Sequence, residues 1–339
     1  MKLRQFLFSF FAILLLIFTG CLERKETITV NRNGETTIVY EIDGNVESFE
    51  NSNSYPTREK WKILKEERYT DKDNNAKIKL KASQTLKSNE VFPVSFTNNS
   101  SNNFSLQFPT QLEIWKEGNK TFYRFERTYQ ARMFKRFNAP DELDENKELE
   151  ERVLDKGIFN VSESDRNQYI ENLTLSMMYH TYAIYLEAIG DMIIQDKFPL
   201  SKKVEAEKMI SAYIEEAFAD TVVLNILLLD ESSIDLAYEN LLNKIELKVS
   251  NIVSEVTDIN QKKTDSPFMI SLSKIKKMYT ITEALTSDKF SVTLHLPGVI
   301  ITTNGFTGPE EQGLIYWEFS GEGLHDAHIP LFALSVVED

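Results

Sequence analysis

The histidines are the first residues to consider for chemistry, because a metal site needs His, Cys, Asp or Glu side chains at ligand spacing. The chain has four histidines, and His325 and His328 lie three apart, with Asp326 between them and Glu322 just before. Two such histidines can share a face of a turn, and a carboxylate could be the third ligand. The alternative is a polar loop between two strands. We favour the loop, so we expect no metal and no cofactor, and His325 and His328 remain weak metal candidates.

His180 lies among apolar neighbours, in a segment with helical spacing. A di-iron helix bundle would need Glu three residues before the histidine, and that position is Met177. We therefore expect His180 to be a hydrogen-bonded core or interface residue. The pair Glu215-Glu216 occupies adjacent helical positions that point apart, which is typical of solvated charges rather than of an acid/base pair.

Motifs for covalent or phosphate chemistry are missing from the sequence. There is no Gly-x-Ser-x-Gly nucleophile elbow and no glycine-rich phosphate loop followed by Lys-Ser/Thr. A glycosidase carboxylate pair has no local spacing signature, so that alternative stays open. The sequence predicts a protein that is not an enzyme, with an envelope hydrolase as the less favoured reading.

Charge and composition restrict the partners. Lys and Arg number 38 against 52 Asp and Glu, a net charge of -14. A nucleic-acid partner is not expected, because binding phosphate backbones needs a basic surface. The composition, 42% hydrophobic and 27% charged, is typical of a folded globular chain. One cysteine excludes an intrachain disulfide.

The first twenty residues read as an export signal, 1–20. Lys2 and Arg4 form a basic start, and Phe6–Phe18 is apolar except for Ser9. That run is shorter than the roughly 20 residues a spanning helix needs. Small residues then lead to Cys21, the one cysteine.

Cleavage before Cys21 resembles the lipobox of bacterial lipoproteins, in which the thiol is diacylglycerylated and the cysteine becomes the new N-terminus. The lipobox usually has Leu three residues earlier, where this chain has Phe18. The alternative is an ordinary signal peptide followed by a chance cysteine. The resemblance implies that a lipid is attached at Cys21 and that this N-terminal lipid holds the protein to a membrane. It also implies a bacterial cell-envelope location, at the outer membrane if the source has one.

Alternating Thr with Ile, Val and Tyr predicts a hairpin over 26–43. A two-residue turn would place the two apolar sets on opposite faces. A three-residue loop, 32–34, pairs Ile28 with Ile38 and gives Gly34 the left-handed position. We favour the second register.

The rest of the chain divides by periodicity. A short helix with Trp61 and Leu64 on one side is expected at 57–69. Extended segments are expected at 78–96, 110–115, 121–129, 290–296, 299–303, 315–319 and 331–337. Helices are expected at 141–156, 163–196, 203–229 and 232–258, with Ser162 and Ser201 as caps.

The two β regions are each small for an independent sheet. The sequence therefore predicts an α+β fold, in which one antiparallel β domain is built from N- and C-terminal segments around an inserted antiparallel helical block. The boundaries are 21–140, 141–278 and 279–339. Two or three domains in series are the alternative.

The C-terminal pattern is a strand, a Leu296-Pro297-Gly298 turn, a strand, an Asn304-Gly305 turn, then Trp317 and Phe319. With the cysteine and Asn-Gly hairpin at the start, it resembles LppM-like bacterial lipoproteins over about 90 residues at the two ends. The resemblance implies an envelope-associated β-rich module that binds lipid or glycolipid, and it carries over no catalytic residue.

Basic residues flank the predicted helical block. If the block is inserted, these residues lie near the junction between the block and the β domain, where they could face anionic lipid headgroups. The alternative is scattered solvated charge. Arg127 belongs to the basic residues that precede the block. The membrane-facing candidates are Arg132, Lys135, Arg136, Lys274, Lys276 and Lys277.

The predicted function is a lipid-anchored, non-catalytic envelope protein that binds a lipid-like or glycan ligand. The alternative is a scaffold whose helical insertion docks an envelope protein partner. A concave apolar pocket in the β domain would favour the first, and an exposed apolar stripe on the helices would favour the second.

Overall fold

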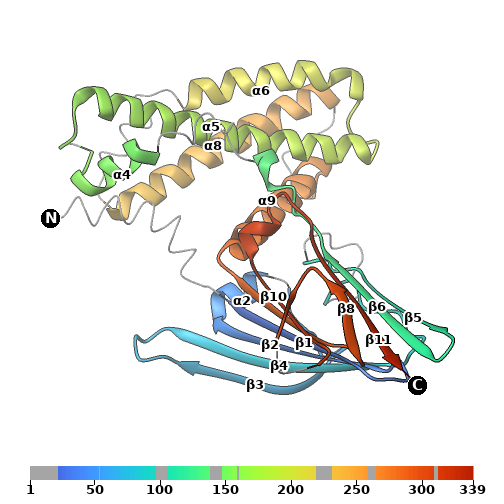
Figure 1. Cartoon of the computed structure of the whole chain (residues 1–339). Helices are drawn as coiled ribbons and strands as arrows, with labels where there is room; N and C mark the ends of the chain where they lie inside the picture. The colour runs from blue at the N-terminus through green and yellow to red at the C-terminus, as the bar shows by residue number, and fades with distance from the viewer. Residues whose placement is uncertain are drawn as a thin grey trace. The chain divides into compact units, whose positions relative to one another are not determined.

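The computed structural model describes residues 22–52, 54–96, 105–137, 147–158, 160–218, 231–258, 265–308 and 312–338. Their contacts divide the chain into two compact units (Figure 1). The helical unit is Phe134–Tyr279, and the β unit takes the described residues of Ile17–Met133 and Thr280–Asp339. The predicted α+β fold, with helices inserted between strand segments, is confirmed.

Seven strands form the larger sheet of the β unit, in the order β3-β4-β2-β1-β7-β10-β9. Their bounds are β1 Glu23–Val30, β2 Thr36–Asn45, β3 Lys62–Thr70, β4 Ala76–Leu86, β7 Lys289–His295, β9 Phe306–Thr307 and β10 Leu314–Ser320. The first strand after the predicted cleavage site is therefore central. It pairs antiparallel with β2 on one side and parallel with β7 on the other. Its place in the sheet depends on residues more than 260 positions later in the chain.

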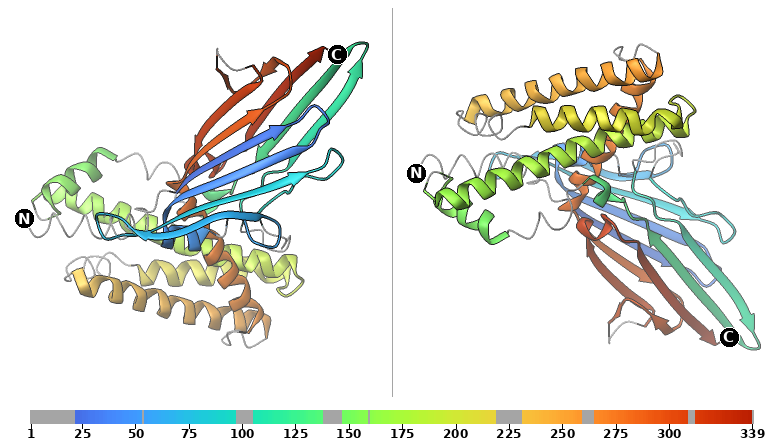
Figure 2. Two further views of the ribbon diagram at one scale, coloured as in Figure 1. Left: turned by 90° about the horizontal axis from the view of Figure 1, so that it is seen from below. Right: turned by 90° about the horizontal axis from the view of Figure 1, so that it is seen from above.

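Four strands form the smaller sheet, in the order β5-β6-β11-β8. Their bounds are β5 Thr110–Glu117, β6 Lys120–Tyr129, β8 Val299–Thr303 and β11 Ile329–Glu338. The two sheets pack face to face, since the Tyr129 ring of β6 lies 6.0 Å from Phe290 and 5.0 Å from Phe319. The strands form two layers in Figure 2. Buried aromatic and aliphatic side chains fill the space between them.

The register predicted for the first hairpin is confirmed. Ile28 pairs with Ile38, Val30 pairs with Thr36, and Gly34 has a φ of +83°. The correct register follows from placing both apolar sets on one face.

The helix expected at 57–69 is wrong, because Lys62–Thr70 is the edge strand β3. Nearly all its side chains are exposed, so the charged residues that suggested a solvated helix decorate a sheet edge instead. A register shift between Ile63 and Lys65 marks a bulge. Charge and a bulge protect an edge from pairing with another chain, and pairing with β4 outweighs the local helix propensity.

The helical unit contains most of the predicted helices. Among the described residues, the helices are α2 Val46–Ser52, α4 Lys147–Lys156, α5 Glu163–Ile194, α6 Lys203–Ala217, α8 Glu231–Thr257 and α9 Pro267–Thr286, and the short 3-10 turns are η1 Phe134–Phe137, η2 Leu200–Lys202 and η3 Gly321–Leu324. Helices α5, α6 and α8 lie side by side (Figure 2).

The Ser162 cap is confirmed, since its side chain accepts the Asp165 N–H. Ser201 is not a cap, because it lies inside η2. Helix α9 was not expected. The segments 141–146 and 219–229, expected as helix, lie outside the described residues. Among the described helices, none combines the length and apolar character needed to cross a bilayer.

Two glycines in the β unit give a matched test of its turns. Gly298 and Gly118 both have positive φ, +82° and +59°. A Cβ on Gly298 would lie 2.0 Å from the Val336 carbonyl oxygen, whereas a Cβ on Gly118 would meet nothing within 4 Å. Left-handed strain of about 1–2 kcal/mol is common to both sites. We expect Gly298→Ala to lower the free energy of unfolding of residues 22–339 by clearly more than Gly118→Ala, as measured by urea denaturation. Equal losses would contradict the contact with Val336.

Candidate functional site

The outer faces of the two sheets differ in character. On the seven-stranded sheet the outward positions of β2 and β4 are mostly polar and paired, as in Lys79 with Asp43 at 3.2 Å and Lys81 with Glu41 at 3.0 Å. This is the usual solvated face of an antiparallel sheet. At the β9 edge the outward side is aromatic instead, since Phe306 is 75% exposed and pairs with Tyr316. The four-stranded sheet also departs from the solvated pattern.

We call the outward side of the four-stranded sheet the aromatic face. Strand pairing aligns Trp115 with Phe122, Phe122 with Val336, and Val336 with Val299, so one apolar row crosses all four strands. Phe332 lies further along β11, and Val299 is 56% exposed. The face consists of Trp115, Phe122, Val299, Phe332, Leu334 and Val336. Val299 is exposed and the other five side chains are half-buried. Contiguous apolar area on a solvent-facing side is the kind of feature found at interaction surfaces.

Charged groups lie within and beside this face. The Trp115 and Phe122 rings stack at 5.2 Å with 10° between their planes, and the Trp115 indole N–H donates to the Glu117 carboxylate at 3.0 Å. The Arg124 guanidinium lies 6.0 Å from the Phe332 ring and also pairs with Glu126. Flat rings beside charged hydrogen-bonding groups suit a ligand with both apolar faces and hydroxyl or anionic groups.

Between the sheets lies a buried ion pair. Arg127 of β6 is fully buried and donates from Nη1 to the Glu26 carboxylate of β1 at 2.5 Å. The same carboxylate oxygen accepts the Tyr129 hydroxyl at 2.9 Å, and Thr110 accepts the Arg127 Nε–H at 2.8 Å. Burial and then the Glu26 charge raise the pKa of Tyr129 well above its ordinary value. Arg127, counted in the sequence among basic residues near the helical block, therefore faces the core and not a membrane.

A second buried ion pair fixes the start of β1. The Arg24 Nε–H donates to the Asp288 carboxylate at 2.6 Å, and neither side chain is exposed. Arg24 also donates to the Ser54 carbonyl, and its guanidinium lies beside the Tyr40 hydroxyl. Burial raises the pKa of Tyr40 to about 12. The other Asp288 oxygen accepts the Leu22 N–H at 3.1 Å.

Sequence reasoning missed these four charges, although alternation carries a signal for them. Arg24 and Glu26 share strand parity with Ile28, which faces the core. Arg127 likewise shares parity with Phe125. Charges at core-facing positions of two strands imply buried partners, because an unpaired buried charge is too costly to keep.

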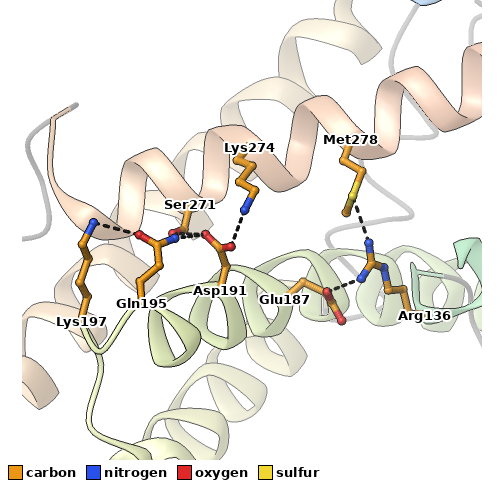
Figure 3. Close-up of polar contacts among 8 residues, drawn as sticks. All are labelled: Arg136, Glu187, Asp191, Gln195, Lys197, Ser271, Lys274 and Met278. Atoms are coloured by element: carbon orange, nitrogen blue, oxygen red, sulfur yellow. Dashed lines mark hydrogen bonds and ion pairs between the residues drawn. The ribbon is translucent and has the colours of Figure 1, made fainter. Parts of the chain in front are cut away.

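In the helical unit, Asp191 of α5 is the centre of a polar cluster with α9 (Figure 3). Its carboxylate accepts from Lys274 Nζ at 2.6 Å, from the Ser271 hydroxyl at 2.7 Å and from Gln195 Nε2 at 2.6 Å. Lys197 in turn donates to Gln195 at 2.9 Å. Burial alone would raise the pKa of Asp191, but these hydrogen bonds outweigh it and lower the pKa. The cluster fastens α9 to α5.

A second group joins η1, α5 and α9. Arg136 pairs with Glu187 at 2.9 Å and contacts the Met278 sulfur at 3.1 Å, as Figure 3 shows. His180 bonds through Nδ1 to the Phe137 carbonyl at 3.2 Å. A carbonyl can only accept, so Nδ1 carries the proton. Burial lowers the pKa of His180, and the Phe137 bond partly offsets this. The geometry gives His180 the hydrogen-bonded packing role expected from the sequence.

The weak metal candidates take part in separate hydrogen bonds. His325 Nε2 lies 2.7 Å from the Thr286 hydroxyl, and His328 Nδ1 accepts the Ala131 N–H at 3.0 Å. Burial lowers the pKa of His325, against the nearby Asp326 and Glu322. Within the described ranges, no group of three or more His, Cys, Asp or Glu side chains is placed to hold a metal ion.

The basic candidates are divided between the units. Arg132 lies in the β unit and donates to Thr282 at 3.2 Å. In the helical unit Arg136 and Lys274 pair with the acids named above, and Lys276 pairs with Glu246. Lys277 is exposed on α9. Cys21 and the Lys135 side chain lie outside what the structure describes. An internal acidic partner cancels charge that would otherwise attract a headgroup.

Comparisons with known proteins give a single weak likeness to report. No family model and no curated protein matches the chain. Among solved structures, the chain is similar to the folded domain of the Mycobacterium tuberculosis protein LppM, determined by NMR, with 8% sequence identity and a TM-score of 0.32. The likeness covers 95% of this chain and 94% of that one. LppM is also the protein type that the C-terminal strand pattern resembles, but a structural likeness this weak supports no argument about function.

The buried pair between the sheets can be tested against an exposed arginine of the same strand. Removing one partner of a buried ion pair costs about 3–5 kcal/mol, and an exposed pair contributes at most about 1 kcal/mol. We expect Arg127→Leu to destabilise the β unit by the larger amount and Arg124→Leu by the smaller, measured by chemical denaturation of residues 22–339. Similar effects at the two arginines would show that the Glu26 pair does not hold the sheets together.

His180 gives the helical unit a pH dependence. Its pKa is lowered in the folded state, so between that pKa and 6.5 the unfolded chain binds more protons and stability falls as pH falls. His180→Asn keeps a donor for the Phe137 carbonyl and removes the titration. We expect wild type to lose more stability than this variant between pH 7.5 and 5.5, in denaturation followed by helical circular dichroism. Parallel pH profiles would contradict the prediction.

Proposed function

We propose that the protein is a lipid-anchored component of a bacterial cell envelope, without catalytic activity, that binds a lipid-like or glycan ligand on the aromatic face. The anchor is Cys21, as the export signal and lipobox pattern suggest. The observation that carries the ligand proposal is the contrast between the outer faces of the two sheets. The larger sheet is mostly polar and paired at β2 and β4, and the smaller sheet presents a row of rings and branched aliphatic side chains with Arg124, Glu117 and Glu126 around it.

The ligand class follows from the composition of that face. Stacked Trp and Phe rings bind flat apolar surfaces, which sugar rings and acyl chains both offer. Arginine and glutamate beside the rings can hydrogen-bond hydroxyl or anionic groups. A purely apolar ligand would not use these charges, so an amphipathic lipid, a glycolipid or a glycan fits best.

The absence of catalysis is part of the proposal. Its support is that the buried carboxylates Glu26 and Asp288 are each held by an arginine, which ties them to folding. Asp191 is likewise held by a lysine.

A second candidate function is a scaffold whose helical unit docks an envelope protein. It is favoured by exposed apolar residues around the connection between α5 and α6, where Ile194 is 84% exposed, Leu200 68% and Val204 60%. This function and the first can be separated by whether a small molecule stays with the purified protein.

The ligand proposal is tested by replacing Trp115, one of the chain's three tryptophans. Trp61 and Trp317 are buried, so Trp115 is the tryptophan that a ligand on the aromatic face would contact. We expect a lipid or glycan to co-purify with residues 22–339, detected by mass spectrometry, and to be lost severalfold in Trp115→Ala. Tyr316→Ala, an aromatic residue of β10 outside the aromatic face, is the control and should retain it. No bound molecule in either protein would favour the scaffold instead.

A further inference from the structure

We propose that the anchor has no flexible linker, so that the end of the β unit where β1 begins lies directly on the lipid bilayer. This inference rests on the proposed lipid attachment at Cys21 and adds where the membrane meets the fold. The bilayer is the one occupant considered for this surface, because the lipidated residue is covalently joined to its first buried residue.

The buried residue is Leu22, the immediate neighbour of Cys21. Leu22 is 0% exposed. Its N–H donates to Asp288 Oδ1 at 3.1 Å and its carbonyl accepts the Lys289 N–H at 2.9 Å. Consecutive Cα atoms lie about 3.8 Å apart across a trans peptide. A lipid on Cys21 is therefore held one residue from the core.

Strand β1, which follows Leu22, is held in place on both sides. β1 lies between β2 and β7, so it cannot leave the sheet without breaking two ladders. The Arg24–Asp288 pair ties its first residues to the segment before β7. Asp288 is also connected to η3, because the Gly321 N–H donates to the Asp288 carbonyl at 2.8 Å. Residues around η3 should therefore lie beside the bilayer with Leu22.

Charge does not hold this end to the membrane. Exposed residues there have both signs, such as Glu23, Lys25, Lys289 and Glu322. Two acyl chains would anchor the protein through burial of methylenes, each contributing about 0.8 kcal/mol. The position is thus set by covalent geometry and should not depend on the content of anionic lipid.

Two single-cysteine variants of the full lipidated protein test this geometry. Glu322→Cys places a thiol in η3 near Leu22, and Arg32→Cys places one in the turn at the far end of β1. Eight strand residues separate the two ends by roughly 25 Å, at about 3.3 Å per residue. Both sites lose one exposed charge. Because Cys21 is acylated, the introduced cysteine is the one thiol left to label with a fluorophore.

In phosphatidylcholine vesicles carrying a headgroup quencher, we expect severalfold stronger quenching at position 322 than at 32. Adding anionic phosphatidylglycerol should leave that ratio unchanged. Twenty Gly/Ser residues inserted between Cys21 and Leu22 should weaken quenching at 322 toward the value at 32, because such a linker spans roughly 25 Å. Equal, weak quenching at both sites without the linker would overturn the inference. Mass spectrometry of the N-terminal peptide separates the two proposals, since an unmodified Cys21 would overturn the anchor itself.

Discussion

The β unit depends on burying two charges of one strand. Arg24 and Glu26 occupy core-facing positions of β1, where neither can stay unpaired without a large loss of free energy. Their partners come from distant segments, Asp288 before β7 and Arg127 in β6. Each pair crosses a different junction, the first joining the chain's early and late segments within one sheet and the second joining the two sheets.

This arrangement explains how the helical block can be inserted in the sequence of the β unit without dividing that unit into two domains. Residues on both sides of the helices are needed for the central β1–β7 pairing and for the Arg24–Asp288 pair. The helical unit has its own core and its own polar contacts, such as the Asp191 cluster between α5 and α9. Each unit thus has a core and charge pairs of its own, which is what an insertion requires.

Sequence patterns predicted the fold where local periodicity agrees with tertiary packing. The first hairpin and α5 satisfy both demands, and their register and Ser162 cap could be inferred. Strand β3 could not, because its local composition favours a helix and only pairing with β4 makes it a strand. The partners of Arg24 and Glu26 lie more than a hundred residues away or come from another sheet, and no local pattern encodes them.

The candidate site was hidden from sequence reasoning for a related reason. Trp115, Phe122, Val336 and Val299 are spread over four strands, and each is an ordinary strand residue where it stands. They form a row only through the pairing of β5, β6, β11 and β8. The inner side of β6 and β11 is already filled by buried residues such as Tyr123, Phe125 and Leu331, so the apolar character of the outer side is not needed to close this core. Apolar side chains that gather on a sheet's solvent side beyond what the core needs are the observation on which the proposed ligand site depends.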